Sequence, residues 1–454
     1  MTPPRAQARA LFRAETSFEA VVVGAGRSGR SAAALLAGRG ARVRLVDDRA
    51  RDGLEPGPDG RPVALFRQEV IDAAELVVLS PGVPRVRREL SRAALEDRLV
   101  GEVELASWCI DIPLLGITGT NGKSTTTALA GEMLRASGKR PFVGGNFGTP
   151  LSELARQPGD ADVGVVELSS YQLESIVDAS FQVGVWLNIQ PDHLDRYSDL
   201  EAYARAKARL HERVPSAGTV IANAADPVVA RWTEKLSSTA KKRWFGRDLG
   251  AGQAGTRIEE QHLRYEGRTI EVSAPGLLGP HNLENAAAAL EAATSLGATL
   301  DGVQTVLSSF AGLPHRLQLV HEAGGVRWYD DSKATNVASA ITAVLAMPAS
   351  TLLIAGGKDK GGAWGPLVEA CRGRVTRVLS IGEAAPIVGK AFAGVVPVQE
   401  CKTLERAIAW ARAEARQGQC VLLAPACASF DQFRSYVDRG ERFARLAREE
   451  WVER

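Results

Sequence analysis

Glycines and a lysine in the stretch ITGTNGKST have the spacing of a phosphate-binding loop. Gly119 and Gly122 can turn successive backbone N–H groups towards phosphate oxygens. The Lys123 ammonium then reaches the β- and γ-phosphates, and the hydroxyl of Ser124 or of the threonine after it can bind Mg²⁺. These residue types predict an ATP site.

The common form of such loops has a further glycine five residues before Gly122, and this chain has Ile117 there. An ordinary glycine-rich helix start is the plain alternative, but it would not need a lysine and hydroxyl residues directly after the glycine. An apolar strand before the loop and a helix after it favour the phosphate-binding interpretation. The stretch therefore predicts a variant phosphate loop.

Polar residues also follow two later apolar runs. Glu167 ends VGVVE and is the right type to hold Mg²⁺ opposite the loop. Its alternative is an acid that the dipole of the next helix favours. Asp192, His193 and Asp195 cluster after VGVWLN, where a Pro-Asp-His turn by itself would be only a turn.

Lys207 lies in the middle of a helix that we expect over residues 201–214. Ser198 and Glu201 form the capping-box pattern that starts such a helix. A lone lysine in mid-helix usually lies on a solvated face, and the residues by themselves favour that interpretation.

A second glycine-rich loop lies near the N-terminus, between a strand and a helix. Gly24, Gly26 and Gly29 give it the G-x-G-x-x-G pattern, and Asp47 ends the next strand, where NAD enzymes place a ribose-binding acid. The loop is either a binding site or simply a tight turn, and a UDP pyrophosphate would suit it as well as NAD. The block is too short for two mononucleotide-binding halves, which disfavours a dehydrogenase.

Apolar β-branched runs alternate with alanine-rich helical runs, which predicts an α/β fold with parallel sheets and crossover helices. We expect a helix at 31–40 and three blocks of strands, at 18–23, 41–47 and 75–80, at 113–119, 162–169, 182–188 and 217–223, and at 326–331, 351–357, 374–382 and 419–425. A β-hairpin with a turn at Glu266-Gly267 joins the second block. The expected domains are residues 1–108, 109–313 and 314–454.

The bulk composition of the 454 residues narrows the class of protein. A net charge of +2, from 55 basic and 53 acidic residues, gives no electrostatic reason for nucleic acid or membrane as the main partner. No apolar run approaches the roughly 20 residues that span a bilayer, and the start of the chain lacks a secretory signal. Five scattered cysteines without a C-x-x-C pair favour a reducing cytoplasm. Nothing in the sequence requires more than a monomer.

Taken together, the motifs resemble the Mur ligase family, the ATP-dependent amino-acid-adding enzymes of bacterial cell-wall synthesis. They are TGTNGKST at 118–125, GN at 145–146, ELSS at 167–170, DHLD at 192–195, GPHNLEN at 279–285, LPHR at 313–316 and DSKATN at 331–336. The likeness runs in order through nearly the whole chain. The third block, with GGKDKG at 356–361 and APACASFDQF at 424–433, resembles the D-glutamate-adding members, and the D-N-P-R motif of the diaminopimelate- and lysine-adding members is absent.

This resemblance implies a fold and a reaction. The fold would have a Rossmann-like N-terminal domain, a P-loop ATPase-type central domain and a Rossmann-like C-terminal domain. ATP would phosphorylate the L-alanyl carboxylate of UDP-N-acetylmuramoyl-L-alanine, and the amine of D-glutamate would attack the acyl phosphate. The enzyme would act in peptidoglycan precursor synthesis, and thus in cell shape and division.

The resemblance also implies roles for particular residues. The reacting groups would lie near Lys123, Glu167, His193, Lys207, His315 and Lys333. ATP would contact Gly119, Thr120, Asn121, Gly122, Lys123, Ser124, Thr125, Asn282, Asn285, Arg316 and Asp331. One Mg²⁺, which Mn²⁺ could replace, would be held by Ser124 and Glu167. A second would be held by His193 and by Lys207, with the lysine carbamylated by CO₂.

Substrate contacts follow in the same way. The UDP-linked substrate would contact Arg27, Ser28, Gly29, Asp47, Asp48, Arg49, Ser80, Pro81, Gly82, Asn146, Ser169, Gln172 and His193. D-Glutamate would contact Thr335, Lys360, Ser429, Phe430 and Tyr436. Two positions depart from the family pattern, since Asp48 stands where a small hydroxyl residue is expected and Tyr436 where phenylalanine is expected.

Four other interpretations remain open at this point. The alanine-adding relative would take free L-alanine, and a folylpolyglutamate synthase shares the ATP domain but has no UDP-type first domain. A NAD-dependent oxidoreductase would explain the first glycine loop and leave Lys123 and Lys207 unexplained. A nucleotide-binding regulator without catalysis would not need the ligands of the reacting groups.

Overall fold

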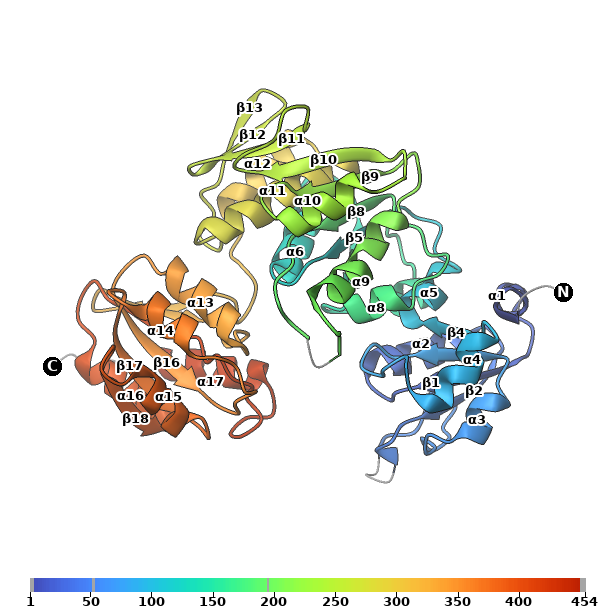
Figure 1. Cartoon of the computed structure of the whole chain (residues 1–454), viewed down its shortest axis with the longest axis horizontal. Helices are drawn as coiled ribbons and strands as arrows, with labels where there is room; N and C mark the ends of the chain where they lie inside the picture. The colour runs from blue at the N-terminus through green and yellow to red at the C-terminus, as the bar shows by residue number, and fades with distance from the viewer. Residues whose placement is uncertain (1–3, 51–53, 194–195, 450–454) are drawn as a thin grey trace. The chain divides into compact units, whose positions relative to one another are not determined.

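The computed structural model describes residues 4–50, 54–193 and 196–449, which contain three separate β-sheets of four, nine and six strands (Figure 1). The chain forms two compact units. The first comprises Met1–Ile270 with Glu284–Val306, and the second comprises Glu271–Leu283 with Leu307–Arg454. The predicted α/β class with mainly parallel sheets is confirmed.

The four-stranded sheet is parallel throughout, in the order β2-β1-β3-β4. Its strands are β1 (Glu19–Val23), β2 (Arg42–Val46), β3 (Leu76–Leu79) and β4 (Leu99–Gly101). The helices are α1 (Pro4–Arg13), α2 (Arg27–Gly38) and α5 (Glu102–Ser107) on one face, and α3 (Gln68–Asp72), the short 3₁₀ helix η2 (Arg88–Leu90) and α4 (Ser91–Leu95) on the other. Burial on both faces explains why the strands are continuous apolar runs. The three strands expected here are confirmed, and β4 was missed.

The nine-stranded sheet has the order β13-β12-β11-β10-β9-β8-β5-β7-β6. Its strands are β5 (Leu114–Thr118), β6 (Pro141–Gly145), β7 (Val163–Glu167), β8 (Val183–Trp186), β9 (Thr219–Asn223), β10 (Lys241–Gly246), β11 (Gly255–Glu259), β12 (His262–Tyr265) and β13 (Arg268–Glu271). The helices are α6 (Lys123–Ala136), α7 (Leu151–Arg156), α8 (Ser170–Glu174), α9 (Leu200–Glu212), α10 (Pro227–Glu234), α11 (Pro280–Ser295) and α12 (Leu300–Ser309). After β5 the chain forms β6 and β7 on one side of that strand and then crosses to β8 on its other side. The loop after β5 therefore lies at the switch point where α/β folds bind ligands.

The six-stranded sheet belongs to the second unit and has the order β14-β15-β19-β16-β17-β18, with only β14 antiparallel. Its strands are β14 (Gln318–Ala323), β15 (Val326–Asp330), β16 (Thr351–Gly356), β17 (Val375–Ile381), β18 (Val398–Lys402) and β19 (Cys420–Leu423). One face packs against α13 (Val337–Ala346), α14 (Gly365–Cys371) and α15 (Ala385–Phe392), and the other against α16 (Leu404–Glu414) and α17 (Tyr436–Arg448).

The start of α9 corrects one expectation. The N-cap is Asp199, whose carboxylate accepts a hydrogen bond of 2.7 Å from the Ala202 N–H, and Ser198 instead donates to that carboxylate at 3.0 Å. A carboxylate at the N-cap also interacts favourably with the helix dipole, which explains why it takes the position from the neighbouring serine. The helix itself is confirmed.

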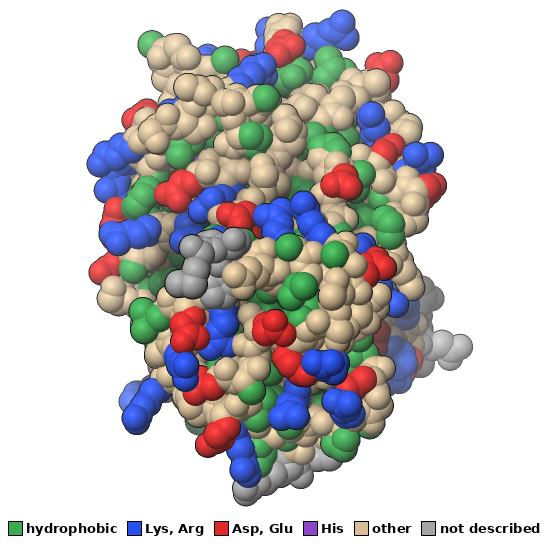
Figure 2. All heavy atoms as spheres, turned by 90° about the vertical axis from the view of Figure 1, so that its right-hand side faces the viewer, with side chains coloured by type: hydrophobic (Ala, Val, Ile, Leu, Met, Phe, Trp, Pro, Cys, Tyr) green, Lys and Arg blue, Asp and Glu red, His purple; other side chains and the backbone are tan. Residues whose placement is uncertain are grey.

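Charged side chains of both signs are interspersed over the face that Figure 2 shows, in agreement with the near-balanced composition. Among the described residues, none of the helices has the length and the apolar character needed to cross a bilayer.

Within the first unit, Glu104 links a helix of the four-stranded sheet to a loop of the nine-stranded sheet by hydrogen bonds. This fully buried carboxylate on α5 accepts three backbone N–H bonds of 2.8–2.9 Å from Val177, Asp178 and Ala179, which follow α8. Its other oxygen accepts a bond of 3.0 Å from the Trp108 indole. Hydrogen bonds to a buried carboxylate are stronger than neutral ones, so the contact stabilises the junction.

Replacing this carboxylate by an amide should destabilise the first unit. In Glu104→Gln, an NH₂ group would face backbone donors, and we expect the melting temperature to fall by about 5 °C. Circular dichroism melting would measure it. The matched control is Glu132→Gln, where an exposed glutamate pairs with Arg135 on the surface and the shift should be below about 1 °C. Equal shifts in both variants would contradict the role given to Glu104.

Candidate active site

The predicted phosphate loop lies at the carboxyl end of β5. Gly119 and Gly122 have φ angles of 156° and 84°, which only glycine adopts without strain, and α6 begins at Lys123 directly after them. Ile117 is fully buried inside β5, one residue before the strand ends. A glycine is therefore not needed at that position, and the variant spacing is compatible with the loop.

Side chains around the loop hold its backbone in place. The Lys123 ammonium donates to the carbonyls of Gly119 and Thr120, both at 2.9 Å. The Asn188 amide oxygen, after β8, accepts from the N–H groups of Thr120 and Asn121 at 3.1 and 2.9 Å. The amide of Asn188 also donates to the Asn121 carbonyl at 3.1 Å. The loop is thus pre-formed around the lysine.

Glu167 and Ser124 meet beside the loop. Glu167 is buried at the end of β7, the neighbour of β5, and its carboxylate accepts bonds of 2.6 Å from the Ser124 hydroxyl and 2.7 Å from the Asn146 amide. A hydroxyl and a buried carboxylate next to a phosphate loop fit Mg²⁺, which keeps waters and substrate oxygens as its other ligands. In the described part of the chain, His, Cys, Asp and Glu form no group of three or more that could hold a metal without such outside ligands.

Lys207 is buried with 1% of its side chain exposed, so the solvated-face interpretation is wrong. Its ammonium nitrogen donates to the Gly119 carbonyl at 2.8 Å and lies 4.6 Å from the centroid of the Tyr203 ring. Burial, and then the nearby charge of Lys123, lower the pKa of Lys207 well below its usual value. The structure thus brings Lys207 to the phosphate loop, and its low pKa favours the neutral, nucleophilic amine.

His193 also lies at this end of the sheet. Its Nδ1 is 2.9 Å from the Tyr171 hydroxyl, its Nε2 is 3.7 Å from a carboxylate oxygen of Asp192, and its ring centroid is 6.0 Å from that of Tyr203. Because the Lys207 amine contacts the same tyrosine ring, the two predicted ligands of the second metal share a neighbour. Asp195 lies outside the described residues.

The predicted ATP residues are divided between the two units. In the first unit, Asn285 on α11 is buried, and its amide oxygen accepts a hydrogen bond of 3.3 Å from the Thr126 hydroxyl. The same amide oxygen would lie 2.2 Å from a Cβ added to Gly122, so Asn285 packs directly against the phosphate loop. In the second, Asn282 donates to the Leu278 carbonyl at 2.8 Å. Arg316 and Asp331 also belong to the second unit, and Thr125 lies in the first turn of α6.

The first glycine loop is held by Asp47, as a tight turn requires. The buried Asp47 carboxylate accepts from the N–H of Ala25 at 2.8 Å and from the N–H of Arg49 at 2.9 Å. Burial alone would raise the pKa of Asp47, but the hydrogen bonds from the Arg49 side chain and from these N–H groups outweigh it and lower the pKa to about 2. The Ser80 hydroxyl donates to the Gly24 carbonyl at 2.9 Å, which closes the loop from the adjacent strand.

The remaining residues predicted for the UDP-linked substrate follow strands of the first two sheets. Arg27 and Gly82 are exposed, Ser28 and Pro81 are half-buried, and Gly29 is buried. A Cβ on Gly29 would lie 1.8 Å from the Gly24 carbonyl oxygen, so the loop requires glycine there. The exposed carboxylate of Asp48, one of the two departures, forms an ion pair of 2.6 Å with Arg87. Ser169 caps α8 and forms a capping box with the buried Gln172.

In the second unit, His315 and Lys333 lie near the carboxyl end of β15. His315 is nearly buried, has a φ of 61°, and its Nδ1 is 2.7 Å from the Asp330 carboxylate. The Lys333 ammonium lies 4.0 Å from the ring centroid of Tyr436, the second departure, so this ring acts as a cation–π partner. The His315 and Tyr436 rings are 6.4 Å apart, which makes these three side chains one cluster.

The other residues predicted for D-glutamate follow strands of the same sheet. Thr335 is half-buried before α13, Lys360 is exposed after β16, and Ser429 and Phe430 follow β19. Ser429 is buried, whereas Phe430 is 71% exposed, which is unusual for a large aromatic side chain. Because β15, β19 and β16 are adjacent and parallel, their carboxyl ends bring these loops to one edge of the sheet.

Asp331 should make the stability of the second unit depend on pH. Burial raises its pKa to about 7, against a lowering effect of Arg316, so between pH 4 and 7 the folded state holds a proton that the unfolded chain has lost. Stability therefore falls as pH rises through this range, by roughly 4 kcal/mol for the change of pKa from 3.8 to about 7.

Melting of Asp331→Asn and wild type at pH 5 and pH 8 tests this. The melting temperature of the variant minus that of wild type should be several degrees larger at pH 8 than at pH 5. Glu400→Gln, at an exposed carboxylate of the same unit, should show no such difference. An Asp331→Asn shift that is equal at both pH values would contradict the protonation of Asp331.

Sequence reasoning missed three residues that the structure places in the site. Asn188 anchors the phosphate loop, Tyr203 contacts both His193 and Lys207, and Asp330 is the partner of His315. Asn188 could have been found as a polar residue at a strand end, as Glu167 was. Asp330, at the end of β15, could have been found in the same way, whereas Tyr203 carries no comparable local signal.

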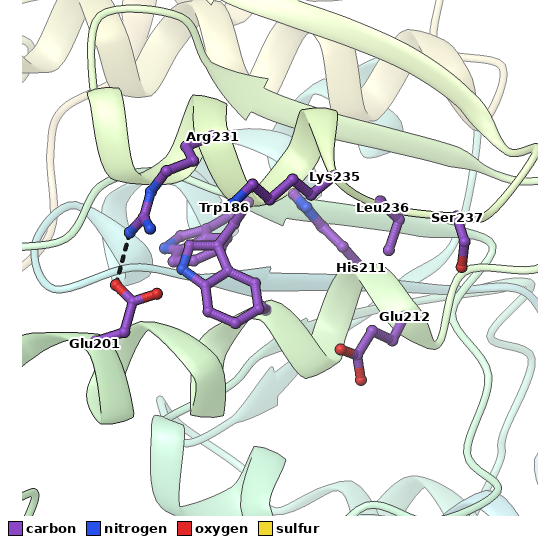
Figure 3. Close-up of a pocket in the computed structure, with 10 residues that line it drawn as sticks. Trp186, Glu201, His211, Glu212, Arg231, Lys235, Leu236 and Ser237 are labelled. Carbon is purple, nitrogen blue, oxygen red and sulfur yellow. Dashed lines mark hydrogen bonds and ion pairs between the residues drawn. The ribbon is translucent and has the colours of Figure 1, made fainter.

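A separate cavity of about 320 Å³ lies between α9 and α10, lined by Trp186, His211, Arg231 and Lys235 among others (Figure 3). The Arg231–Glu201 ion pair of 2.6 Å crosses one end. Burial lowers the pKa of His211 to about 3, so this histidine is neutral and belongs to the core. None of the predicted site residues lines this cavity.

The fold and the loop after β5 define an α/β protein with a P-loop-type central sheet, and comparison with known proteins assigns its family. Three family models match the chain, the Mur ligase MurD-like N-terminal domain over residues 18–100, the Mur ligase middle domain over 117–293 and the Mur ligase glutamate ligase domain over 315–427. The chain belongs to the Mur ligase family.

Relatives with assigned names indicate which member of the family this chain resembles. The chain is 43% identical to a protein of Myxococcus xanthus named UDP-N-acetylmuramoylalanine--D-glutamate ligase, over 94% of this chain and 97% of the relative. An Anaeromyxobacter dehalogenans protein of the same name is also 43% identical, with the same coverage.

Solved structures support the fold. MurF from Acinetobacter baumannii matches with a TM-score of 0.62 at 17% identity, over 96% of this chain and 91% of that one. MurF ligase from Thermotoga maritima, in complex with ADP, matches with a TM-score of 0.60 at 18% identity, over 84% and 90%.

Proposed function

We propose that this protein joins D-glutamate to the L-alanyl carboxylate of UDP-N-acetylmuramoyl-L-alanine at the expense of ATP, in peptidoglycan precursor synthesis. The observation that carries the proposal is identity of 43%, over nearly the full length, to relatives named for this reaction. The pre-formed phosphate loop and the cluster of His315, Lys333 and Tyr436 support it, because each supplies residue types that the reaction needs.

In the first unit, the loop residues bind and orient the triphosphate. Lys123 and the start of α6 face the phosphates with positive charge, so they neutralise charge that develops on the transferred phosphoryl group. Ser124 and Glu167 would hold Mg²⁺, which would supply positive charge to neutralise the phosphates. The loop around Asp47 would hold the UDP end of the substrate, and Asn146, Ser169 and Gln172 its muramoyl-alanine arm.

Lys207 is proposed to act as a carbamate. Its neutral amine attacks CO₂: a C–N bond forms as one C=O π bond of CO₂ opens, and a proton passes from the nitrogen to water, so a neutral amine becomes an anionic oxygen donor. The buried position beside Gly119 supports this, because an uncarbamylated lysine there offers no ligand to a hard cation. His193 would be the second protein ligand, with its ring oriented by Tyr171.

In the second unit, Lys333 and Lys360 would neutralise the acyl phosphate and the D-glutamate carboxylates, while Thr335, Ser429, Phe430 and Tyr436 shape the acceptor site. Arg316 and Asp331 would contact ATP, with His315 near the reacting groups. We also propose the domain limits 1–108, 109–313 and 314–454, a cytoplasmic location and a monomer.

Phosphate release with ATP, Mg²⁺ and UDP-N-acetylmuramoyl-L-alanine, across a panel of free amino acids, tests the function. Release with D-glutamate alone is the expected result. Release with L-alanine on UDP-N-acetylmuramate would instead assign the preceding step, and no release with any acceptor would contradict ligase activity.

A further inference from the structure

Arg439 is a fully buried arginine whose role is not explained by the reaction as proposed. It lies on α17, three residues after Tyr436, and among the described residues its guanidinium donates only to uncharged oxygens. Its Nε and Nη2 bond to the hydroxyl and carbonyl of Ser332 at 2.9 and 2.8 Å. Its Nη1 and Nη2 bond to the Cys427 carbonyl at 3.2 Å, and Nη1 also bonds to the Ala428 carbonyl at 3.4 Å.

These partners belong to two different loops. Ser332 follows β15, in the DSKATN motif that carries Lys333 and Thr335, while Cys427 and Ala428 follow β19. One planar guanidinium therefore joins the two sides of the predicted acceptor site. A lysine could not do so, because its ammonium is a point donor without the fixed fork of an arginine.

Stability alone does not account for a charge at this place. In the described part of the chain the Asp330 carboxylate pairs with His315, and no ion pair reaches Arg439. Burial lowers the pKa of Arg439 to about 10, against smaller raising effects of the Asp431 and Asp330 charges. A buried cation without a directly paired anion is costly, and apolar side chains of similar volume often replace buried charges without loss of stability.

The next residue shows how closely this helix approaches the reacting groups. A Cβ on Gly440 would lie 2.2 Å from the His315 Nδ1 and 2.6 Å from the Asp330 carboxylate. The start of α17 is thus fixed against the His315–Asp330 pair by Gly440 and against both loops by Arg439.

We infer that Arg439 is a positioning residue for the acceptor: it sets the spacing between the loop of Lys333 and Thr335 and the loop of Ser429 and Phe430, and its charge favours an acceptor with two carboxylates. This inference rests on the proposed function, since it concerns the site for D-glutamate. Arg439 acts through the loops and does not touch the reacting atoms.

The test compares Arg439→Met and Arg439→Lys with wild type, and uses Arg448→Met as the matched control. Arg448 lies on the same helix and also donates to a backbone carbonyl, that of Val320, but it is exposed. Phosphate release is measured against D-glutamate concentration, and separately with hydroxylamine, which attacks the acyl phosphate without needing the acceptor site.

In Arg439→Met, kcat/KM for D-glutamate should fall about 10–100-fold, the size of effect seen for residues that orient direct ligands. Phosphate release with hydroxylamine should stay near the wild-type rate. Arg439→Lys keeps the charge but not the fork, so it should recover only part of the loss, and Arg448→Met should match wild type. Equal losses in both reactions, or loss of the folded state in both Arg439 variants on melting, would assign Arg439 to folding and overturn the inference.

The wild-type measurement tests the proposed function separately. A wild type without D-glutamate-dependent release contradicts the proposed function, and the inference falls with it. A wild type that uses D-glutamate, together with Arg439 variants whose kinetics are unchanged, overturns the inference alone.

Discussion

Lys123→Ala should lower kcat/KM for ATP on the order of 10³-fold, because it removes a preorganised cation from the point where negative charge develops. In the structure the Lys123 ammonium is held by two carbonyls of its own loop and lies at the start of α6. The loop itself therefore holds the ammonium at the start of α6 before ATP binds. ADP release in a coupled assay measures the effect.

The control is Lys139→Ala, at an exposed lysine just beyond the end of α6, which should keep wild-type activity. Binding of the UDP-linked substrate, measured by calorimetry, should be unchanged in Lys123→Ala because the loop around Asp47 belongs to a different sheet. Activity of Lys123→Ala within tenfold of wild type would show that this loop does not serve phosphoryl transfer.

Strands with strong apolar character could be predicted from the sequence, and others could not. Runs such as VVV in β1 and LLIAG in β16 are buried on both faces and leave a continuous signal. The missed strands β6 and β10 have the sequences PFVGG and KKRWFG, in which glycines or cations interrupt the apolar run. Their pairing with β7 and β9 forms these strands, and such tertiary pairing has no local signal.

The candidate site likewise contains residues that could be predicted from the sequence and residues that could not. The phosphate loop could be predicted because its chemistry requires particular residues at fixed spacing. The partners that fix those residues come from distant positions, such as Asn188 for Thr120 and Asp330 for His315, and only the fold brings them together. Lys207 shows the limit most clearly, because a lone lysine in mid-helix is expected on a solvated face and the structure instead buries it against the phosphate loop.

Lys207→Ala should lower ligase activity on the order of 10³-fold if the carbamate supplies an anionic oxygen ligand, an effect as large as that of other preorganised electrostatic groups. Short carboxylates such as acetate should restore part of the rate, because the space left by the side chain admits an oxygen donor. Arg205→Ala, at an exposed position of the same helix, should keep wild-type activity.

The melting temperature distinguishes a carbamate role of Lys207 from a role in packing alone. Lys207 is buried, and its nitrogen donates to the Gly119 carbonyl, so Lys207→Met should keep the melting temperature or raise it while activity is lost. A ¹³C-carbamate resonance in wild type under ¹³CO₂, absent from Lys207→Met, would identify the adduct directly. Activity retained in Lys207→Met would mean that the buried amine serves the loop backbone only, and the carbamate would then have no part in the reaction.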